Sequence, residues 1–396
     1  MNWSLSWHGL RTVAGLELRQ RVRSRGWVIA LVCWFVVIGA VTSLIIAFTH
    51  QVYDLGEASG DQAAYSSGGP LAFGIITLFV LAMGLVIAPA FTATSINGDR
   101  QAGTLATLQA TSLSALEIAA GKLAAAWLTA AVFLVVALPF IVWSVVLGGI
   151  GAAQVIVCFA VVLAEVLIVC AIGLGWSAVI TRTVGSTIMT YLCVLTLSVL
   201  SLFVMLLLMP LVTDDHATVR SWSQPDVETS SDPEHIAAGC RWVTLDDASI
   251  THTERIWWLS AANPFVIVAD AAPLPDAARD DVGQYASEAS DPLALIRVAM
   301  LQARRGTPAE TDDCVWAFSG ISMYRIVTDD DGDVRVYRSG QVIYTSPVKD
   351  PPLTAGTPIW PWGLGVHLVF GAAGFVAAVR RLSVPYGKLP KGTRIA

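Results

Sequence analysis

The sequence predicts an α-helical integral membrane protein with six transmembrane helices, cytoplasmic N- and C-termini, and an α+β extracytoplasmic domain inserted between helices 5 and 6. Composition is the first observation behind this prediction. Of the 396 residues, 55% are hydrophobic and 14% are charged, and the mean hydropathy is +0.64, whereas a soluble chain carries about 25% charged residues. The second observation is that uncharged residues fall in long runs: 26–53, 62–98, 123–164, 183–213 and 351–379.

These runs are long enough to place each span. Runs of about 18 or more apolar residues indicate transmembrane helices, whereas the strands of a membrane barrel alternate. The run after Lys122 holds two spans, which Gly148, Gly149 and Gly151 separate. The first run is too long for the roughly 7–15 apolar residues of a cleaved signal peptide. The predicted spans are 27–49, 71–96, 123–147, 154–180, 187–212 and 358–380.

The distribution of charge gives the orientation. Basic residues mark the cytoplasmic side of a membrane protein, and they concentrate in the N-terminal segment 1–26 and the tail 381–396. Segment 213–357 has 23 acidic and 11 basic residues, a net charge of −12, against −6 for the whole chain. We therefore place 213–357 outside a multi-pass plasma-membrane protein. A nucleic-acid partner is not expected, because no basic patch lies away from the membrane.

The parts outside the spans have distinct patterns. Residues 8–24 have apolar residues at helical spacing, and five arginines lie in the segment 11–25. This pattern favours an amphipathic helix in the membrane interface over a solvated helix end. In the outer domain, 213–255 is polar and rich in turn residues. Segment 256–271 is apolar but too short to cross, so we predict that it rests on or dips into the outer membrane surface.

The rest of the outer domain predicts a helix followed by a sheet. Residues 291–304 have a helical pattern that starts at an Asp-Pro pair. Three segments then alternate apolar and polar residues, with Asp331-Gly332 and Ser339-Gly340 at the joints, which predicts a meander with tight hairpins. The predicted strands are 321–328, 333–338 and 341–346.

Motifs for chemistry are missing. Neither Gly121-Lys122 nor Gly387-Lys388 has the upstream glycine and following Ser or Thr of a phosphate-binding P-loop. The acidic run 329–333 lacks the ligand spacing of an EF-hand, so a solvated hairpin turn is the favoured interpretation. We therefore predict no catalytic residue, no metal site and no cofactor bound by this chain.

The loop between spans two and three, residues 97–122, is the most informative segment. It predicts a short helix at about 100–110 and a second helix start at Ser114, where Glu117 completes a capping box. The loop contains, in order, Asp99-Arg100, Gly103-Thr104-Leu105, Leu108-Gln109-Ala110-Thr111, Ser114, Glu117-Ile118 and Gly121-Lys122.

This pattern resembles that of ABC-2 type transporter permeases. The family often has Glu before the Arg and Pro after the Thr, where this chain has Asp99 and Ser112. The six spans, the amphipathic N-terminal helix and the Asn263-Pro264-Phe265 segment are also similar to the family. The resemblance covers about 1–270 and the last span. Residues 272–357 match nothing in it, and the outer domain is larger than is usual there.

The resemblance implies a function and its partners. Two such permeases, as a homodimer or heterodimer, would form the path of an ATP-driven exporter in contact with membrane lipid. Each would sit on a separate ABC ATP-binding subunit, two copies in all, which would bind ATP and Mg. The loop would act as the coupling helix, with Arg100, Leu105 and Leu108 facing that subunit or bracing the loop. The implied coupling residues are Asp99, Arg100, Gly103, Thr104, Leu105, Leu108, Thr111, Glu117 and Lys122.

Two other classes of function stay open. The chain could be a membrane-anchored structural or sensor protein whose outer domain binds a partner. An integral membrane enzyme is the third class, and the absence of a catalytic constellation disfavours it. Copurification of a nucleotide-binding subunit separates the first class from the second. Because the spans carry few polar side chains, an amphipathic or lipid-like substrate is favoured over a small ion.

Glu165 is the acid that the predicted spans contain, near the middle of span four. A charge at that depth costs at least ~2.5–3.5 kcal/mol, so the carboxyl group must be partnered or neutral. One interpretation is a residue of the transport path or a proton-linked switch. The other is a protonated carboxyl group that is hydrogen-bonded between helices.

The cysteines predict one disulfide. Four of the six lie in predicted spans, where a thiol acts as a small apolar group: Cys33, Cys158, Cys170 and Cys193. Cys240 and Cys314 are the two outside, and both fall in the outer domain. Since that side permits disulfides, we predict that they bridge; the alternative is two free thiols.

Overall fold

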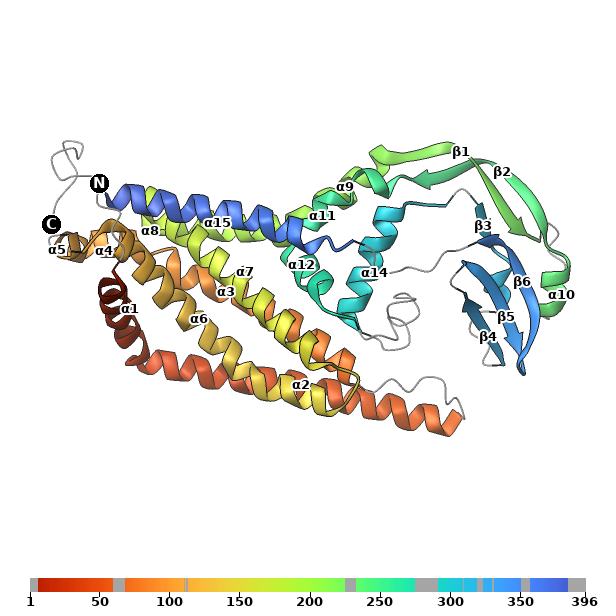
Figure 1. Cartoon of the computed structure of the whole chain (residues 1–396), viewed down its shortest axis with the longest axis horizontal. Coiled ribbons are helices and arrows are strands. Elements are labelled where there is room, and N and C mark those ends of the chain that lie inside the picture. Colours follow the sequence, from red (N-terminus) through yellow and green to blue (C-terminus); the bar gives the residue numbers. More distant parts are fainter. Residues whose placement is uncertain are drawn as a thin grey trace.

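The computed structural model describes residues 6–59, 68–109, 111, 113–224, 233–274, 291–308, 310–318, 323–329, 331–349 and 357–383. Figure 1 shows a bundle of long helices with two small sheets beyond one of its ends. The start of the first helix and the end of the last lie together at the other end of the bundle.

Six helices of the described chain are long and apolar enough to cross a membrane, as predicted. They are α2 (Arg25–Ser59), α3 (Gly69–Thr92) with α4 (Ser95–Gln101), α6 (Ala115–Val146), α7 (Ala152–Val179), the composite span Thr183–Val212, and α15 (Trp360–Leu382). Helix α2 runs ten residues beyond the predicted end of span one at 49. The composite fifth span consists of α8 (Thr183–Leu195), a π-helix (Thr196–Leu200), α9 (Ser201–Leu208) and a 3-10 turn (Met209–Val212).

Helix α7 lies at the centre of the bundle and packs against α3, α6 and α15. Glycines allow its closest approaches. A Cβ atom on Gly374 of α15 would lie 2.7 Å from the carbonyl oxygen of Ala171, and one on Gly175 would lie 2.5 Å from the Cα of Gly374. Small residues at such contacts let the backbones of membrane helices pack directly. The apolar core of the bundle therefore consists of contacts between neighbouring spans.

Before span one, α1 (Trp7–Val22) lies across α6. Its buried residues are Gly9, Val13 and Ala14, and Val13 sits 2.6 Å from the position of a Cβ on Gly121 of α6. The exposed side carries Arg11 and Arg19. The buried side of the helix thus contacts protein, and its position in the membrane interface stays a prediction.

The segment after span five differs from its sequence prediction. Residues 213–255, expected to be turn-rich, contain two eleven-residue strands, β1 (Thr213–Ser223) and β2 (Arg241–Thr251), joined by α10 (Pro233–Ala238). They pair antiparallel, and β3 (Glu310–Asp312) adds parallel to β1, giving the order β2-β1-β3. The strands escaped prediction because their faces do not alternate cleanly: most of their side chains are partly or fully exposed.

The second sheet is the predicted meander: β4 (Tyr324–Thr328), β5 (Asp333–Arg338) and β6 (Gln341–Lys349), all antiparallel. The turns fall at the predicted residues, and Gly332, Ser339 and Gly340 have positive φ. A helical turn, Val315–Phe318, precedes the sheet. Phe318 is buried against Tyr324 and Tyr344, so it fixes this turn to both outer strands.

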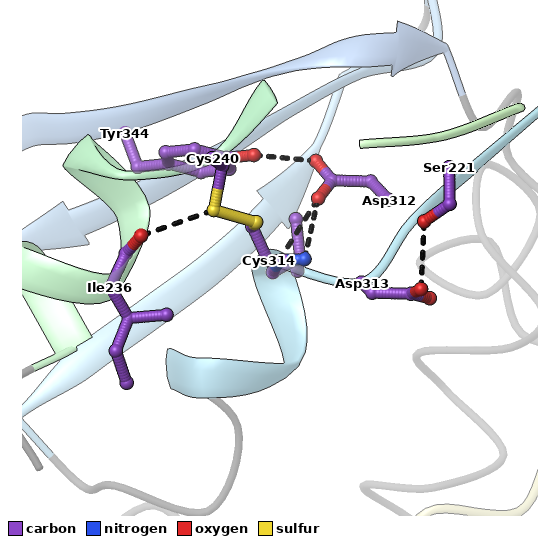
Figure 2. Close-up of a disulfide and its surroundings, with 8 residues drawn as sticks. Ser221, Ile236, Cys240, Asp312, Asp313, Cys314 and Tyr344 are labelled. Atoms are coloured by element: carbon purple, nitrogen blue, oxygen red, sulfur yellow. Dashed lines mark hydrogen bonds between the residues drawn. A yellow bond between two sulfur atoms is a disulfide. The ribbon is translucent and has the colours of Figure 1, made fainter. Parts of the chain in front are cut away.

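The predicted disulfide between Cys240 and Cys314 is present, and its Cα atoms are 6.6 Å apart (Figure 2). It joins Cys240, directly before β2 of the first sheet, to Cys314, directly before the helical turn that packs on the second sheet. Next to it, the Tyr344 hydroxyl donates to the Asp312 carboxylate at 2.7 Å. Burial, together with this negatively charged neighbour, raises the pKa of Tyr344 above its ordinary value.

Three helices lie between the spans and the sheets: α11 (Trp258–Ala261), α12 (Pro264–Ala271) and α14 (Pro292–Arg305). Asp291 caps α14, at the helix start predicted from its Asp-Pro pair. Segment 256–271 was predicted at the membrane surface. That position stays a prediction, but α12 packs against α7 and α15, and Ile267 and Val268 are wholly buried in the core of the spans.

Candidate coupling site

The loop between spans two and three forms two short helices instead of the single helix expected at about 100–110. Helix α4 (Ser95–Gln101) follows α3 almost directly, and α5 (Thr104–Gln109) comes after a break. The break falls at Gly103, whose φ of 74° is in the left-handed region. A residue with a Cβ adopts that conformation at a cost, so glycine suits this corner. Both helices lie at the end of the bundle opposite the sheets.

Helix α4 is fixed to spans four and five by buried hydrogen bonds. The backbone N–H groups of Ile96 and Asn97 donate to Ser177 Oγ of α7 at 2.9 and 3.2 Å. The Asn97 side chain, with no exposed surface, donates to Ser186 Oγ of α8 at 2.6 Å. Asn97 was not among the predicted site residues. A buried amide has to be hydrogen-bonded, but its partners lie about 80 and 89 residues away in sequence.

The leucines of α5 brace the loop against the protein. Leu105 is buried, and Leu108 packs against the same apolar cluster, which includes Ile118 of α6, Leu174 of α7 and Leu382 of α15. Gln109 also donates from its side chain to the Leu382 carbonyl at 3.0 Å. Of the two roles predicted for Leu105 and Leu108, this packing supports bracing.

Lys122 joins three helices through a buried ion-pair cluster. Its ammonium group lies 2.5 Å from Glu17 of α1 and 2.6 Å from Asp99 of α4, and its side chain is 1% exposed. Arg21 extends the cluster, at 3.5 Å from Glu17. The resemblance had grouped Asp99 with Lys122, and the structure brings them into contact. Their charges face each other, so the pair fixes α4 to α6, while the Asp99 side chain remains 28% exposed.

Glu117 connects the starts of α1 and α6. Its carboxylate accepts from the Ser114 backbone N–H at 2.7 Å and from the Ser6 backbone N–H at 2.8 Å. The Ser114 hydroxyl in turn accepts from the Glu117 N–H, which completes the predicted capping box. One carboxylate thus satisfies N–H groups at both helix starts.

Several described residues of α4 and α5 are exposed around Gly103. Among the predicted residues, Thr104 and Thr111 are exposed, and Arg100 and Gly103 are half-buried. Gln101 and Ala102 are exposed as well, although the sequence analysis did not single them out. These described residues form the accessible corner around Gly103 at this end of the bundle.

A second polar site lies inside the bundle, at Glu165. Its Oε2 is 2.8 Å from Nδ1 of His367 on α15, and His367 Nε2 is 2.7 Å from the Ala262 carbonyl oxygen. Both side chains are buried. The acid is therefore partnered, as its depth requires, and the partner is a histidine 202 residues away. No group of three or more His, Cys, Asp or Glu in the described ranges is arranged to hold a metal ion.

Six spans, an N-terminal helix laid across them and a helical loop tied to four of them define the membrane-spanning subunit of a transporter. The family model described as "ABC-2 family transporter protein" matches residues 11–271, about two thirds of the chain, so the chain belongs to the ABC-2 transporter family. A comparison with curated proteins found no match. The family is the multi-pass, non-catalytic membrane component of plasma-membrane ABC transporters and associates with an ABC ATP-binding subunit.

Proposed function

We propose that this permease forms half of the translocation path of an ATP-driven exporter. The conformational change of the ATP-binding subunit would be transmitted to it through α4 and α5. Two permeases, identical or different, would pair, and two separate ATP-binding subunits would bind ATP and Mg and hydrolyse the ATP. The observation that carries this proposal is the attachment of α4 and α5. Their described residues leave an exposed corner around Gly103, while other residues of the two helices contact α6, α7, α8 and α15 and connect to α1 through Lys122.

This attachment lets a push on the corner reach most of the bundle. Helix α4 follows α3 after two residues, so its displacement acts along span two. Asn97 passes the displacement to spans four and five, and Lys122 passes it to span three and α1. Rigid helices joined by buried polar contacts are a physical route for such coupling.

The disulfide supports the orientation of this proposal. Disulfides form in oxidising compartments and are rare in the cytosol, so the sheets next to which Cys240 and Cys314 lie belong outside. The opposite end, with α4 and α5, then faces the cytoplasm, where ATP-binding subunits reside. The arginines of α1 lie at that same end, in agreement with the positive-inside rule.

Exposed apolar faces support pairing and lipid contact. The most apolar stretch of span five buries no residue within one chain, and that of α2 buries 17% of its residues. Such faces need either lipid or a second permease. The amphipathic or lipid-like substrate class inferred from the sequence is part of the proposal.

A membrane-anchored sensor is the second candidate function, and the size of the segment between spans five and six favours it. The two sheets form a folded unit that a binding partner would recognise. A sensor would not need an ATPase, however, and the elaborate attachment of α4 and α5 would then have no task. Binding of an ATP-binding subunit separates the two.

Replacing both leucines of α5 by aspartate should uncouple the exporter. Burying an acid where Leu105 packs costs roughly 2–5 kcal/mol, which shifts the docking of α5 by about 30-fold or more. Since α5 has six residues, the spans should stay folded. We expect Leu105→Asp/Leu108→Asp to lose most nucleotide-dependent transport and to lose affinity for the ATPase, measured by reconstituted transport and by copurification.

The matched control is Val342→Asp on β6, where the side chain is 49% exposed at the other end of the molecule. This variant should bind the ATPase and transport as the unmodified chain does. Full coupled ATPase activity in the double-aspartate variant would reject α5 as part of the coupling site.

A further inference from the structure

The helices α11, α12 and α14 connect the outer sheets to the spans. They make buried contacts with the spans in addition to lying over the end of the bundle. Helix α12 is inserted among the spans, with Ile267 and Val268 fully buried. Gly363 of α15 permits close approach here, since a Cβ at that position would lie 2.1 Å from the Ala261 carbonyl oxygen. Larger residues would hold α15 away from α11.

The buried Glu165–His367 pair links the segment between α11 and α12 to the spans α7 and α15. His367 Nε2 must donate to the Ala262 carbonyl, which has no proton to give. A second proton then has to lie between Nδ1 and Glu165 Oε2, because a bare carboxylate facing a nitrogen lone pair would be repelled. The pair as a whole is neutral, so it can remain buried. It ties α7 to α15 and to the segment between α11 and α12.

Asp270 provides a second fastening near the outer end of span six. Its Oδ2 accepts from the Ile359 and Trp360 N–H groups at the start of α15, at 2.6 and 2.8 Å. Its Oδ1 lies 3.6 Å from Arg297 Nε on α14, and Arg297 also donates to the Ala272 carbonyl at 3.0 Å. Burial lowers the pKa of Arg297, and Asp270 opposes that change. This one carboxylate therefore joins α12, α14 and the start of α15.

Helix α14 also touches span two, the span that continues into the coupling site. A Cβ on Gly74 would lie 2.6 Å from Pro292 Cδ, so the start of α14 is seated directly on α3. At its other end, Arg304 donates to the Thr357 carbonyl just before α15, at 3.2 Å. Just past that end, Thr307 Oγ1 donates to the Thr251 carbonyl oxygen at the end of β2, at 3.2 Å, so this end of α14 is bonded to the first sheet.

We propose that α11, α12 and α14 form an adaptor that passes movement of spans two, four and six to the two outer sheets, so that the outer domain moves with each ATP-driven cycle. The inference rests on the proposed coupling function and adds a moving part to it. The sheets would then move together with the spans, on the side where an exported substrate leaves. They would not be a binding module on an immobile membrane anchor.

Hydrogen exchange of the permease bound to its ATP-binding subunit tests this inference. Exchange is compared between the ADP state and the state trapped with ATP and vanadate, in the coupling helices (95–109), the adaptor helices (258–271 and 292–305) and the sheets. We expect all three regions of the unmodified complex to differ between the two states. If the coupling helices change and the adaptor and sheets do not, the adaptor role is wrong. If no region changes, the proposed coupling fails, and the adaptor role fails with it.

Variants at the contacts between the adaptor helices and the spans sharpen the test. Glu165→Gln should keep the response of the sheets, because its amide N–H can donate to His367 Nδ1. Glu165→Leu removes that bond without leaving a buried charge and should abolish the nucleotide-dependent difference in the sheets while keeping it in 95–109. Gly74→Val, which wedges α14 away from α3, should have the same effect and serves if Glu165→Leu folds poorly. Gly365→Ala is the control, since a Cβ there meets nothing within 4 Å. An unchanged response of the sheets in both Glu165→Leu and Gly74→Val overturns the proposal.

Discussion

Lys122→Met is expected to destabilise the permease by on the order of 3 kcal/mol, because removing one partner of a buried ion pair leaves the other charges uncompensated. The lysine is 1% exposed, and Glu17 and Asp99 are 19% and 28% exposed, so water can screen the remaining carboxylates only in part. Helix α1 and helix α4 should both loosen from α6. Unfolding of the detergent-solubilised protein, monitored by denaturant titration, measures this loss, and copurification of the ATPase should fall in parallel.

A second substitution separates the charge effect from lost packing. In Lys122→Met/Asp99→Asn one of the orphaned carboxylates is gone, so this variant should be more stable than Lys122→Met alone. A stability of Lys122→Met within about 0.5 kcal/mol of the unmodified chain, the range of ordinary surface substitutions, would show that the cluster does not hold these helices together.

Loss of the disulfide should have a comparably large effect, confined to the outer domain. Cys240 and Cys314 are 74 residues apart in sequence, and closing a loop of that length is worth about 4 kcal/mol in the chain-entropy model. In Cys240→Ser/Cys314→Ser we expect the sheets to unfold at lower denaturant and to be cleaved by protease, while the spans remain intact. Limited proteolysis without reductant, read by fragment mass, measures both.

Cys33→Ser is the matched control, since Cys33 is a free, exposed cysteine in span one. It should leave the proteolysis pattern unchanged. Equal protease resistance of the double-serine variant and the unmodified protein would show that the sheets hold together without the bridge.

The sequence was sufficient to predict features that depend on local pattern or on elimination. The spans followed from uncharged runs longer than one bilayer crossing. The capping box at Ser114 and Glu117 follows from two residues three positions apart. The disulfide followed because Cys240 and Cys314 were the two cysteines outside the spans. None of these predictions requires knowledge of which distant segments meet.

Features that depend on distant contacts could not be predicted. His367 is a single histidine in an apolar helix, and nothing in its neighbourhood connects it to Glu165. Strands β1 and β2 stabilise each other across the sheet, with Trp222 packed against Trp242, although each one alone has a polar sequence. The loop motif indicated Asp99 and Lys122 but not that they form a buried pair, and it left open whether Leu105 faces a partner or braces the loop.

The central claim is that this permease is driven by a separate ATP-binding subunit that docks on the exposed corner of α4 and α5. The most direct measurement is copurification of the membrane-extracted permease in mild detergent, followed by an ATPase assay and by crosslinking from a photoreactive residue at Gln101. The account predicts a stoichiometric ATP-binding protein that hydrolyses ATP and is crosslinked at that corner. An intact, folded permease that purifies with no ATP-binding protein, or one crosslinked to it only from the outer sheets, would contradict the account.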